Sequence, residues 1–320
     1  MKKIRSLALA SLFVLSVASA NAGTLVEKFT TDPVLDGWQV FGDTNLFQWD
    51  STNHILDVTW NSTQPNSYFY HPLGVTLTTN DSFCVQFDLR LTNVATTGDG
   101  NEIAIGLLHF FDATNADFNR ANSPLPNLFE FDYFPAFVDP SDGPFPASVN
   151  ATLKDSQPGY AGFYVVYDNV TLDPTVTYRV VLIHRAGEGV ITGAIYTNGV
   201  VVSTLPLGYG SAPVGDFQLD TLSVNCFTDD GYGDSVSAQG SVANLAFATP
   251  LPVDKIKSSA AGLVQFTSDT NWLYTLEQSA DFQTWTPAAP ATFGNGTNLV
   301  LQATNPPADK SFYRVRADLP

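Results

Sequence analysis

The chain has 320 residues, of which 31 are acidic and 14 are basic. A surface with this excess of negative charge repels nucleic-acid backbones, anionic lipids, and sulfated or uronic polymers. Charged residues nevertheless make up only 14% of the chain and aromatic residues 12%, so the composition is that of a packed protein and excludes a disordered acidic tail.

Residues 1–22 have the organisation of a secretion signal. A basic start (Lys2–Arg5) precedes an apolar stretch (Leu7–Val17), and Ala20–Ala22 supplies the small-x-small pattern of a cleavage site. The apolar stretch is too short to span a bilayer, which needs roughly 20 such residues. Cleavage leaves 11 basic against 31 acidic residues, a net charge of −20. We therefore expect a secreted protein, extracellular or periplasmic, without membrane insertion.

The rest of the chain shows the pattern of an all-β protein. Short runs of β-branched and aromatic residues alternate with clusters of Gly, Pro, Asn and Asp, and no sustained helical period is present. Many short strands without helices between them predict antiparallel sheets packed face to face. The predicted strands are 55–60, 67–71, 83–91, 102–110, 128–133, 162–167, 177–184, 189–196, 199–204, 217–227, 241–248, 263–267, 272–278, 284–287, 298–303 and 311–317.

The clusters of Gly, Pro, Asn and Asp between these runs predict the domain organisation. A first domain covers residues 23–249, a proline-containing linker covers 250–257, and a small second domain covers 258–320. Two long polar stretches, 112–127 and 135–158, are predicted to be loops. Loops of this length in a compact domain are either functional or mobile, so they are candidates for a binding rim or for plain surface loops.

The two cysteines are predicted to lie on different kinds of strand face. Cys84 alternates with the apolar Phe83 and Val85, whereas Cys226 shares a face with Leu222 and Val224. Thiols on different faces seldom reach the Cα separation of ~4.4–6.8 Å that a disulfide requires. Alternation therefore argues against a bridge, although export makes one chemically possible.

Several sequence motifs together suggest a known architecture. They are Asp36–Gly42, Leu46–Asp50, Asn66–Tyr70, Phe129–Pro135, Thr177–Val180 and Gly240–Leu245 in the first domain, and Trp272–Glu277, Asp281–Trp285 and Phe312–Ala317 in the second. Residues 24–249 resemble the N-terminal domain of secreted proteins from environmental bacteria, which is similar to concanavalin A-like lectin/glucanase and laminin G-like jelly rolls. Residues 258–320 resemble the small immunoglobulin- or fibronectin-like module that often ends such proteins. The resemblance implies an antiparallel jelly-roll β-sandwich followed by a second, smaller β-sandwich.

The resemblance directs attention to the carboxylates of residues 128–135. Glucanases of this fold carry Glu-x-Asp-x-Glu or Glu-x-Asp-x-x-Glu on one strand, and retaining hydrolysis needs two carboxyl groups about 5–5.5 Å apart. Here Glu130 and Asp132 share one strand face, but Phe134 and Pro135 occupy the two positions for the second glutamate. Glu130 and Asp132 are therefore interpreted as ligand-binding residues or as a coincidental match, and no catalytic residue is predicted.

Two tyrosines are further candidates for ligand binding. Tyr68 and Tyr70 share a strand face opposite Phe69, so they face away from the core if Phe69 is buried. Neutral sugars stack their apolar faces on aromatic rings. We expect Tyr68 and Tyr70 to face solvent or a cleft.

A glycine-rich acidic turn suggests a cation. Asp229, Asp230 and Asp234 place three carboxylates in a short loop, which is the kind of oxygen cluster that calcium prefers. The spacing departs from the EF-hand pattern, so an ordinary acidic turn is the alternative to a structural calcium site. No other cofactor is expected.

Together these features predict a secreted, non-enzymatic binding protein that recognises neutral carbohydrate through its jelly-roll domain. One alternative is a polysaccharide hydrolase or lyase that uses Glu130 or Asp132 with a partner from another strand. A second alternative is a structural or adhesive cell-surface protein that binds a cell-surface polymer.

Overall fold

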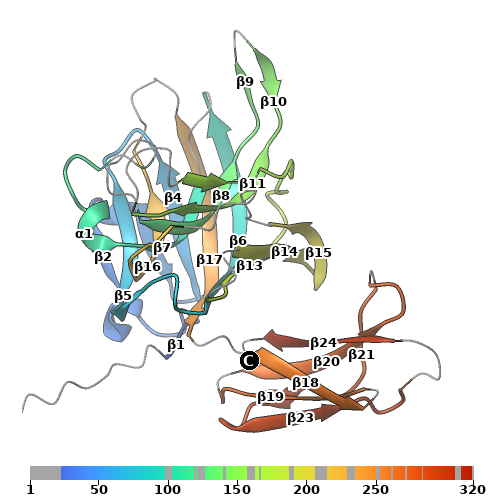
Figure 1. Ribbon diagram of the computed structural model, residues 1–320. Coiled ribbons are helices and arrows are strands. Elements are labelled where there is room, and N and C mark those ends of the chain that lie inside the picture. The colour runs from blue at the N-terminus through green and yellow to red at the C-terminus, as the bar shows by residue number, and fades with distance from the viewer. Residues whose placement is uncertain are drawn as a thin grey trace, which may run out of the picture.

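Two large antiparallel sheets lie face to face in the first part of the chain, and two small sheets follow in the second (Figure 1). The computed structural model describes residues 23–320 except 98–102, 119, 121–126, 140–141, 157–162, 166, 187–190, 206–214, 229–234, 250–252, 261, 271, 283, 307–310 and 319–320. This architecture confirms the expected jelly-roll β-sandwich followed by a smaller sandwich. The predicted signal, residues 1–22, and the predicted calcium ligands Asp229, Asp230 and Asp234 lie outside the described residues.

The first large sheet has eight strands, and β1 (Thr24–Glu27) pairs with one of its inner strands, β17. The other strands, in spatial order, are β15 (Val200–Thr204), β14 (Ile191–Thr197), β13 (Tyr178–His184), β6 (Phe83–Thr96), β17 (Val236–Ala248), β4 (Ile55–Asn61) and β3 (Phe47–Asp50).

The second large sheet has seven strands. In spatial order they are β12 (Phe163–Val165), β11 (Ser148–Lys154), β8 (Leu128–Phe134), β7 (Ile103–Leu108), β16 (Leu219–Cys226), β5 (Ser67–Leu77) and β2 (Gln39–Phe41). Neighbours in both sheets are mostly distant in sequence, so loops cross between the sheets, as a jelly roll requires.

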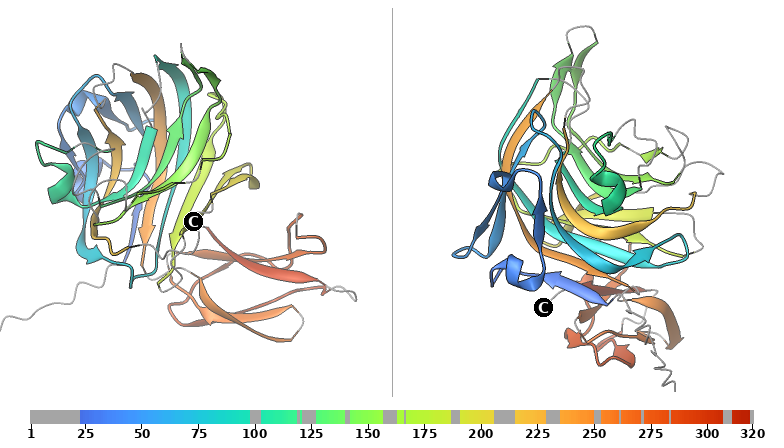
Figure 2. Two further views of the ribbon diagram at one scale, coloured as in Figure 1. Left: turned by 45° about the horizontal axis from the view of Figure 1, so that its top comes forward. Right: turned by 90° about the vertical axis from the view of Figure 1, so that its left-hand side faces the viewer.

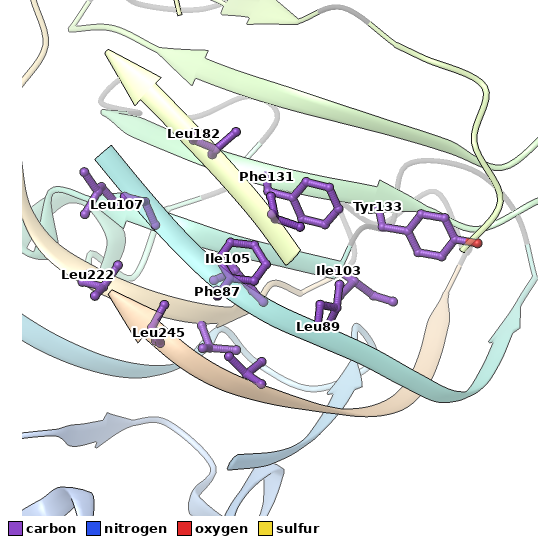
Figure 3. Packing of buried hydrophobic residues seen from close by; sticks show 14 of the residues in the cluster. Phe87, Leu89, Ile103, Ile105, Leu107, Phe131, Tyr133, Leu182, Leu222 and Leu245 are labelled. Atoms are coloured by element: carbon purple, nitrogen blue, oxygen red, sulfur yellow. The ribbon is translucent and has the colours of Figure 1, made fainter. Parts of the chain in front are cut away.

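The core lies between the two sheets and follows from strand alternation (Figure 3). Phe87 and Leu89 of β6 point inward from the eight-stranded sheet, and Phe131 and Tyr133 of β8 point inward from the seven-stranded sheet. The rings of Phe87 and Phe131 meet edge to face, with centroids 5.8 Å apart. Burying each such side chain stabilises the fold by about 1.5–3 kcal/mol.

The small domain begins inside the predicted linker, because β18 starts at Asp254. The domain has its own core around Phe266, Trp272 and Tyr274. Its three-stranded sheet contains β18 (Asp254–Ala260), β19 (Leu263–Thr267) and β23 (Asn298–Gln302), and its four-stranded sheet contains β20 (Leu273–Ser279), β21 (Thr286–Pro287), β22 (Thr292–Phe293) and β24 (Phe312–Asp318).

Each predicted strand has a counterpart, but the prediction of two long loops was wrong in part. Residues 135–158 contain a hairpin of β9 (Phe137–Asp139) and β10 (Gly143–Phe145), which projects beyond the sandwich (Figures 1 and 2), and the complete strand β11. The stretch 112–127 overlaps the short helix α1 (Phe110–Ala113). Two short 3-10 helices, η1 (Pro33–Asp36) and η2 (Thr44–Leu46), flank β2.

Both cysteines are free, as alternation indicates, and both are buried. Cys226 belongs to the core between the large sheets. Cys84 lies on the opposite side of the eight-stranded sheet, where it and Ala248 pack into the core cluster of the small domain. The two thiols therefore serve separate hydrophobic clusters.

Candidate functional site: the polar face of the seven-stranded sheet

In the seven-stranded sheet, the central strands β11, β8, β7 and β16 are buried on both faces, and their outward face carries polar side chains. In β8, Phe129 and Phe131 point into the core, so Glu130 and Asp132 point to the other side, where neither is exposed to solvent. The sequence predicted this shared direction correctly. The neighbouring strands β7, β11 and β16 contribute further side chains. We define the polar face by these outward residues, namely Ala104, Gly106, Glu130, Asp132, Asn150, Thr152, Lys154, Ser223 and Asn225.

Small residues of β7 form the floor of this face. Asp132 pairs across strands with Ala104, and Glu130 pairs with Gly106. A Cβ atom at Gly106 would lie 2.2 Å from the carbonyl oxygen of Phe129, so only glycine fits. Because Ala104 and Gly106 are small, the Asn225 side chain of β16 reaches across β7. Its Nδ2 donates to Glu130 Oε2 at 3.0 Å.

One arginine joins the two carboxylates. Arg120 donates from Nε to Glu130 Oε1 at 2.8 Å and from Nη2 to Asp132 Oδ2 at 2.7 Å. Lys154 Nζ donates to the Arg120 carbonyl oxygen at 2.6 Å, and the Thr152 hydroxyl donates to Asp132. Two acidic and two basic side chains thus meet in a nearly dry layer. Their burial is tolerated because each charge has close partners.

Asp132 has a shifted pKa within this cluster. Burial raises its pKa above the ordinary value, while Arg120 and the hydrogen bonds from Thr152 and Asn150 lower the pKa in opposition. Burial is the largest of these effects. A raised pKa at a buried carboxyl that also has a specific charged partner is a common mark of functional sites.

Several polar atoms of this face have no hydrogen-bond partner among the described residues. They are Asp132 Oδ1, Asn150 Oδ1, Ser223 Oγ and Asn225 Oδ1. All four residues are buried, and an unsatisfied buried polar atom costs roughly 1–3 kcal/mol. Most buried polar atoms in proteins have a hydrogen-bond partner, so four unpartnered oxygens on one sheet face are unusual. The described side chains thus leave hydrogen-bond acceptor capacity unused on this face.

The predicted tyrosines lie on the same side of this sheet but not at its surface. Phe69 is in the core, so the predicted alternation is confirmed. Exposure was predicted wrongly, because Tyr68 is fully buried and Tyr70 is 9% exposed. Tyr68 donates its hydroxyl to the Ala113 carbonyl oxygen at 3.0 Å, and the Tyr70 ring packs on Phe110 with centroids 4.3 Å apart. Helix α1 thus covers both rings, a second layer that alternation does not reveal.

The strands beside β8 supply amides and hydroxyls. Thr152 and Gly106 flank Glu130, and Asn150 and Ala104 flank Asp132. Phe134 occupies the next outward position of β8, as predicted.

In the part of the chain that the structure describes, no group of three or more His, Cys, Asp or Glu side chains could hold a metal ion. Calcium at Asp229, Asp230 and Asp234 stays a prediction.

The sequence did not reveal six participants at this face: Arg120, Asn150, Thr152, Lys154, Ser223 and Asn225. Two signals were available. Residues 148–154 alternate apolar Val149, Ala151 and Leu153 with polar neighbours, which is the pattern of a half-polar strand. The same alternation in β16 points Ser223 and Asn225 outward. For Arg120, which follows α1 outside any strand, no periodic signal existed.

Comparisons with known proteins add likenesses of fold. No protein-family model and no curated protein sequence matches the chain. Among solved structures, lectin I-B4 from Griffonia simplicifolia is similar at 10% identity and a TM-score of 0.42, covering 71% of this chain and 99% of that one. A legume lectin-like domain from Entamoeba histolytica is similar at 13% identity and a TM-score of 0.40, covering 70% and 95%.

An alginate lyase in complex with an alginate trisaccharide is similar at 10% identity and a TM-score of 0.40, covering 72% of this chain and 99% of that one. At such identities and TM-scores, the ligand of the polar face has to be argued from its own residues. Within the described residues, no helix has the length and apolar character needed to cross a membrane.

Proposed function

We propose that the protein is a secreted, non-enzymatic binding protein whose jelly-roll domain recognises a neutral carbohydrate through the polar face. The observation that carries this proposal is the group of four unpartnered buried oxygens on Asp132, Asn150, Ser223 and Asn225. Sugar hydroxyls are donors that satisfy such acceptors, and a site built to receive donors discriminates strongly against ligands that lack them.

Charge supports a neutral ligand. Beside the polar face, Arg120 already pairs with both Glu130 and Asp132, so its charge is engaged by two carboxylates and does not call for an additional anion. The net charge of the chain, −17, also opposes anionic polymers. Secretion rests on the basic, apolar and small-x-small organisation of residues 1–22.

Affinity electrophoresis on a panel of neutral polysaccharides, followed by calorimetry with the best ligand, tests the proposal. We expect one neutral glycan to retard the wild-type protein. Asn150→Ala and Ser223→Ala should each weaken binding by about tenfold, the equivalent of about 1.4 kcal/mol. Glu277→Gln, which alters a buried carboxylate of the small domain, is the matched control and should bind like wild type. Folded protein that binds no neutral glycan, or that prefers anionic ones, would contradict the proposal.

Glycan cleavage is a second candidate, favoured by the raised pKa of Asp132 beside Glu130. A general acid needs a pKa near the working pH, and burial of a carboxyl group raises its pKa in this direction. Release of new reducing ends from neutral glycans, abolished in both Glu130→Gln and Asp132→Asn, would establish cleavage in place of binding alone.

A further inference from the structure

Strand β15 forms an edge of the eight-stranded sheet and is unusually apolar. It pairs with β14 on one side, and no other described strand pairs with it (Figure 1). Its first three residues are valines, and Val200, Val201 and Val202 are 64%, 41% and 41% exposed. Consecutive residues of a strand point to opposite faces, so apolar surface is exposed on both sides of this edge.

Strand β15 lacks two of the usual protections of an edge strand, lysine and proline, but it has a third, a β-bulge. Natural proteins blunt free edges with lysine, proline, inward charges or a covering segment. Residues 189–215 contain no Asp, Glu, Lys, Arg or His at all, in a chain with 31 acidic and 14 basic residues. A β-bulge is present, since Ile195 pairs with Ser203 and Tyr196 with Val201, which leaves Val202 unpaired. The bulge bends the strand but adds no charge.

We propose that β15 is a self-association edge, and that its occupant is β15 of a second copy of this chain. Two antiparallel copies of one edge strand are related by a two-fold axis, so the same residues contact each other and no second sequence is required. Charge favours this segment of the molecule, although the Asp168 carboxylate accepts a hydrogen bond from the Ser203 hydroxyl of β15. Two copies with a net charge of −17 each repel one another, and the repulsion is weakest where a long uncharged segment meets its equivalent.

Sedimentation velocity and light scattering on the full chain test this dimer across a concentration series. We expect a dimer that dissociates on dilution, and tighter association at high salt, because salt screens the repulsion between two acidic copies. Val202→Lys should weaken the dimer by about tenfold or more, since it places like charges across the two-fold axis. Val34→Lys is the matched control, because Val34 is 66% exposed but lies in η1 rather than on a strand, and it should dimerise like wild type.

Cysteine substitution provides a second readout that does not depend on affinity. Both native cysteines are buried, and burial raises the pKa of Cys84 to about 12, so neither competes for oxidation. We expect at least one of Val200→Cys, Val201→Cys and Val202→Cys to form a disulfide-linked dimer under mild oxidation, whereas Val34→Cys should not. Wild-type protein that stays monomeric up to its solubility limit would overturn the proposal. So would a dimer that Val202→Lys leaves as tight as wild type.

Discussion

Among the described residues, each domain contains a cluster that joins arginine to buried carboxylate, and the two clusters are built in opposite ways. In the jelly roll, one arginine, Arg120, joins two carboxylates, Glu130 and Asp132. In the small domain, one carboxylate, Glu277, joins two arginines, Arg314 and Arg316. The carboxylates are buried in both places. The Arg120 side chain is only 9% exposed, whereas Arg314 and Arg316 are 37% and 42% exposed.

The difference lies in what each cluster leaves unsatisfied. Both oxygens of Glu277 accept from an arginine, and Arg314 also stacks over the Trp285 ring at 4.4 Å. In the jelly roll, Asp132 Oδ1 and three neighbouring oxygens have no partner among the described residues. The small-domain cluster thus has a structural role, because it links β20 to β24 through satisfied ion pairs. The jelly-roll cluster has acceptor capacity that the fold itself does not use, and this capacity marks it as the candidate site.

Removing the central arginine of the jelly-roll cluster should have the largest effect on stability. Arg120→Met leaves two buried carboxylates without their cation, and breaking a buried pair in this way costs about 3–5 kcal/mol. We expect the free energy of unfolding, measured with urea at neutral pH, to fall by this amount. The loss should shrink at acidic pH, where the carboxylates are protonated. A loss below about 1 kcal/mol at neutral pH would place the cluster in the same class as a surface ion pair.

The pH dependence of stability should isolate Asp132. Its pKa is raised in the folded protein, so the folded state keeps a proton at pH values where the unfolded chain has released it. The stabilisation is complete below the ordinary pKa of an aspartate and is lost as the pH rises through the folded pKa. Each unit of difference between the folded and unfolded pKa is worth about 1.4 kcal/mol.

Asp132→Asn has no such titration. Urea unfolding of wild type and variant at a series of pH values should therefore show the variant gaining stability relative to wild type across this range. Parallel curves for the two proteins would mean that burial does not dominate the pKa of Asp132.

The smallest effect is expected in the small domain. Glu277→Gln removes the negative charge, but Arg314 and Arg316 are more than a third exposed and remain solvated, and glutamine still offers one acceptor and a donor. We expect the free energy of unfolding to fall by about 1 kcal/mol or less, as for exposed pairs. A loss as large as that of Arg120→Met would remove the distinction between the two clusters.

Strand alternation explains why the side-chain directions at the polar face were predicted correctly and why the exposure of the tyrosines was predicted wrongly. Alternation in residues 128–134 correctly placed Glu130 and Asp132 together, and alternation around Phe69 correctly placed Tyr68 and Tyr70 on the other side of the sheet. It reports only the direction of a side chain. Whether a second layer covers that face depends on contacts distant in sequence, such as the Tyr68 hydroxyl with Ala113.

Composition misled the prediction where a strand lay inside a polar segment. Proline, aspartate and glycine around residues 135–158 indicate a loop, and they do form the projecting β9–β10 hairpin. The following strand β11 was missed because its outward residues are polar and its inward residues include the small Ala151. Residues 148–154 form a strand because all seven of them pair with β8. Local composition does not encode this long-range pairing.

The position of Cys84 and Ala248 has a consequence for how the protein unfolds. Both residues belong to large-sheet strands, β6 and β17, but pack against Trp272 and Tyr274 of the small domain. The two domains therefore share a hydrophobic cluster, and melting either one exposes apolar surface of the other. Elements that share buried surface in this way open as one cooperative unit. Calorimetry should accordingly record a single transition rather than two, with the small domain as a thermodynamic part of the jelly roll.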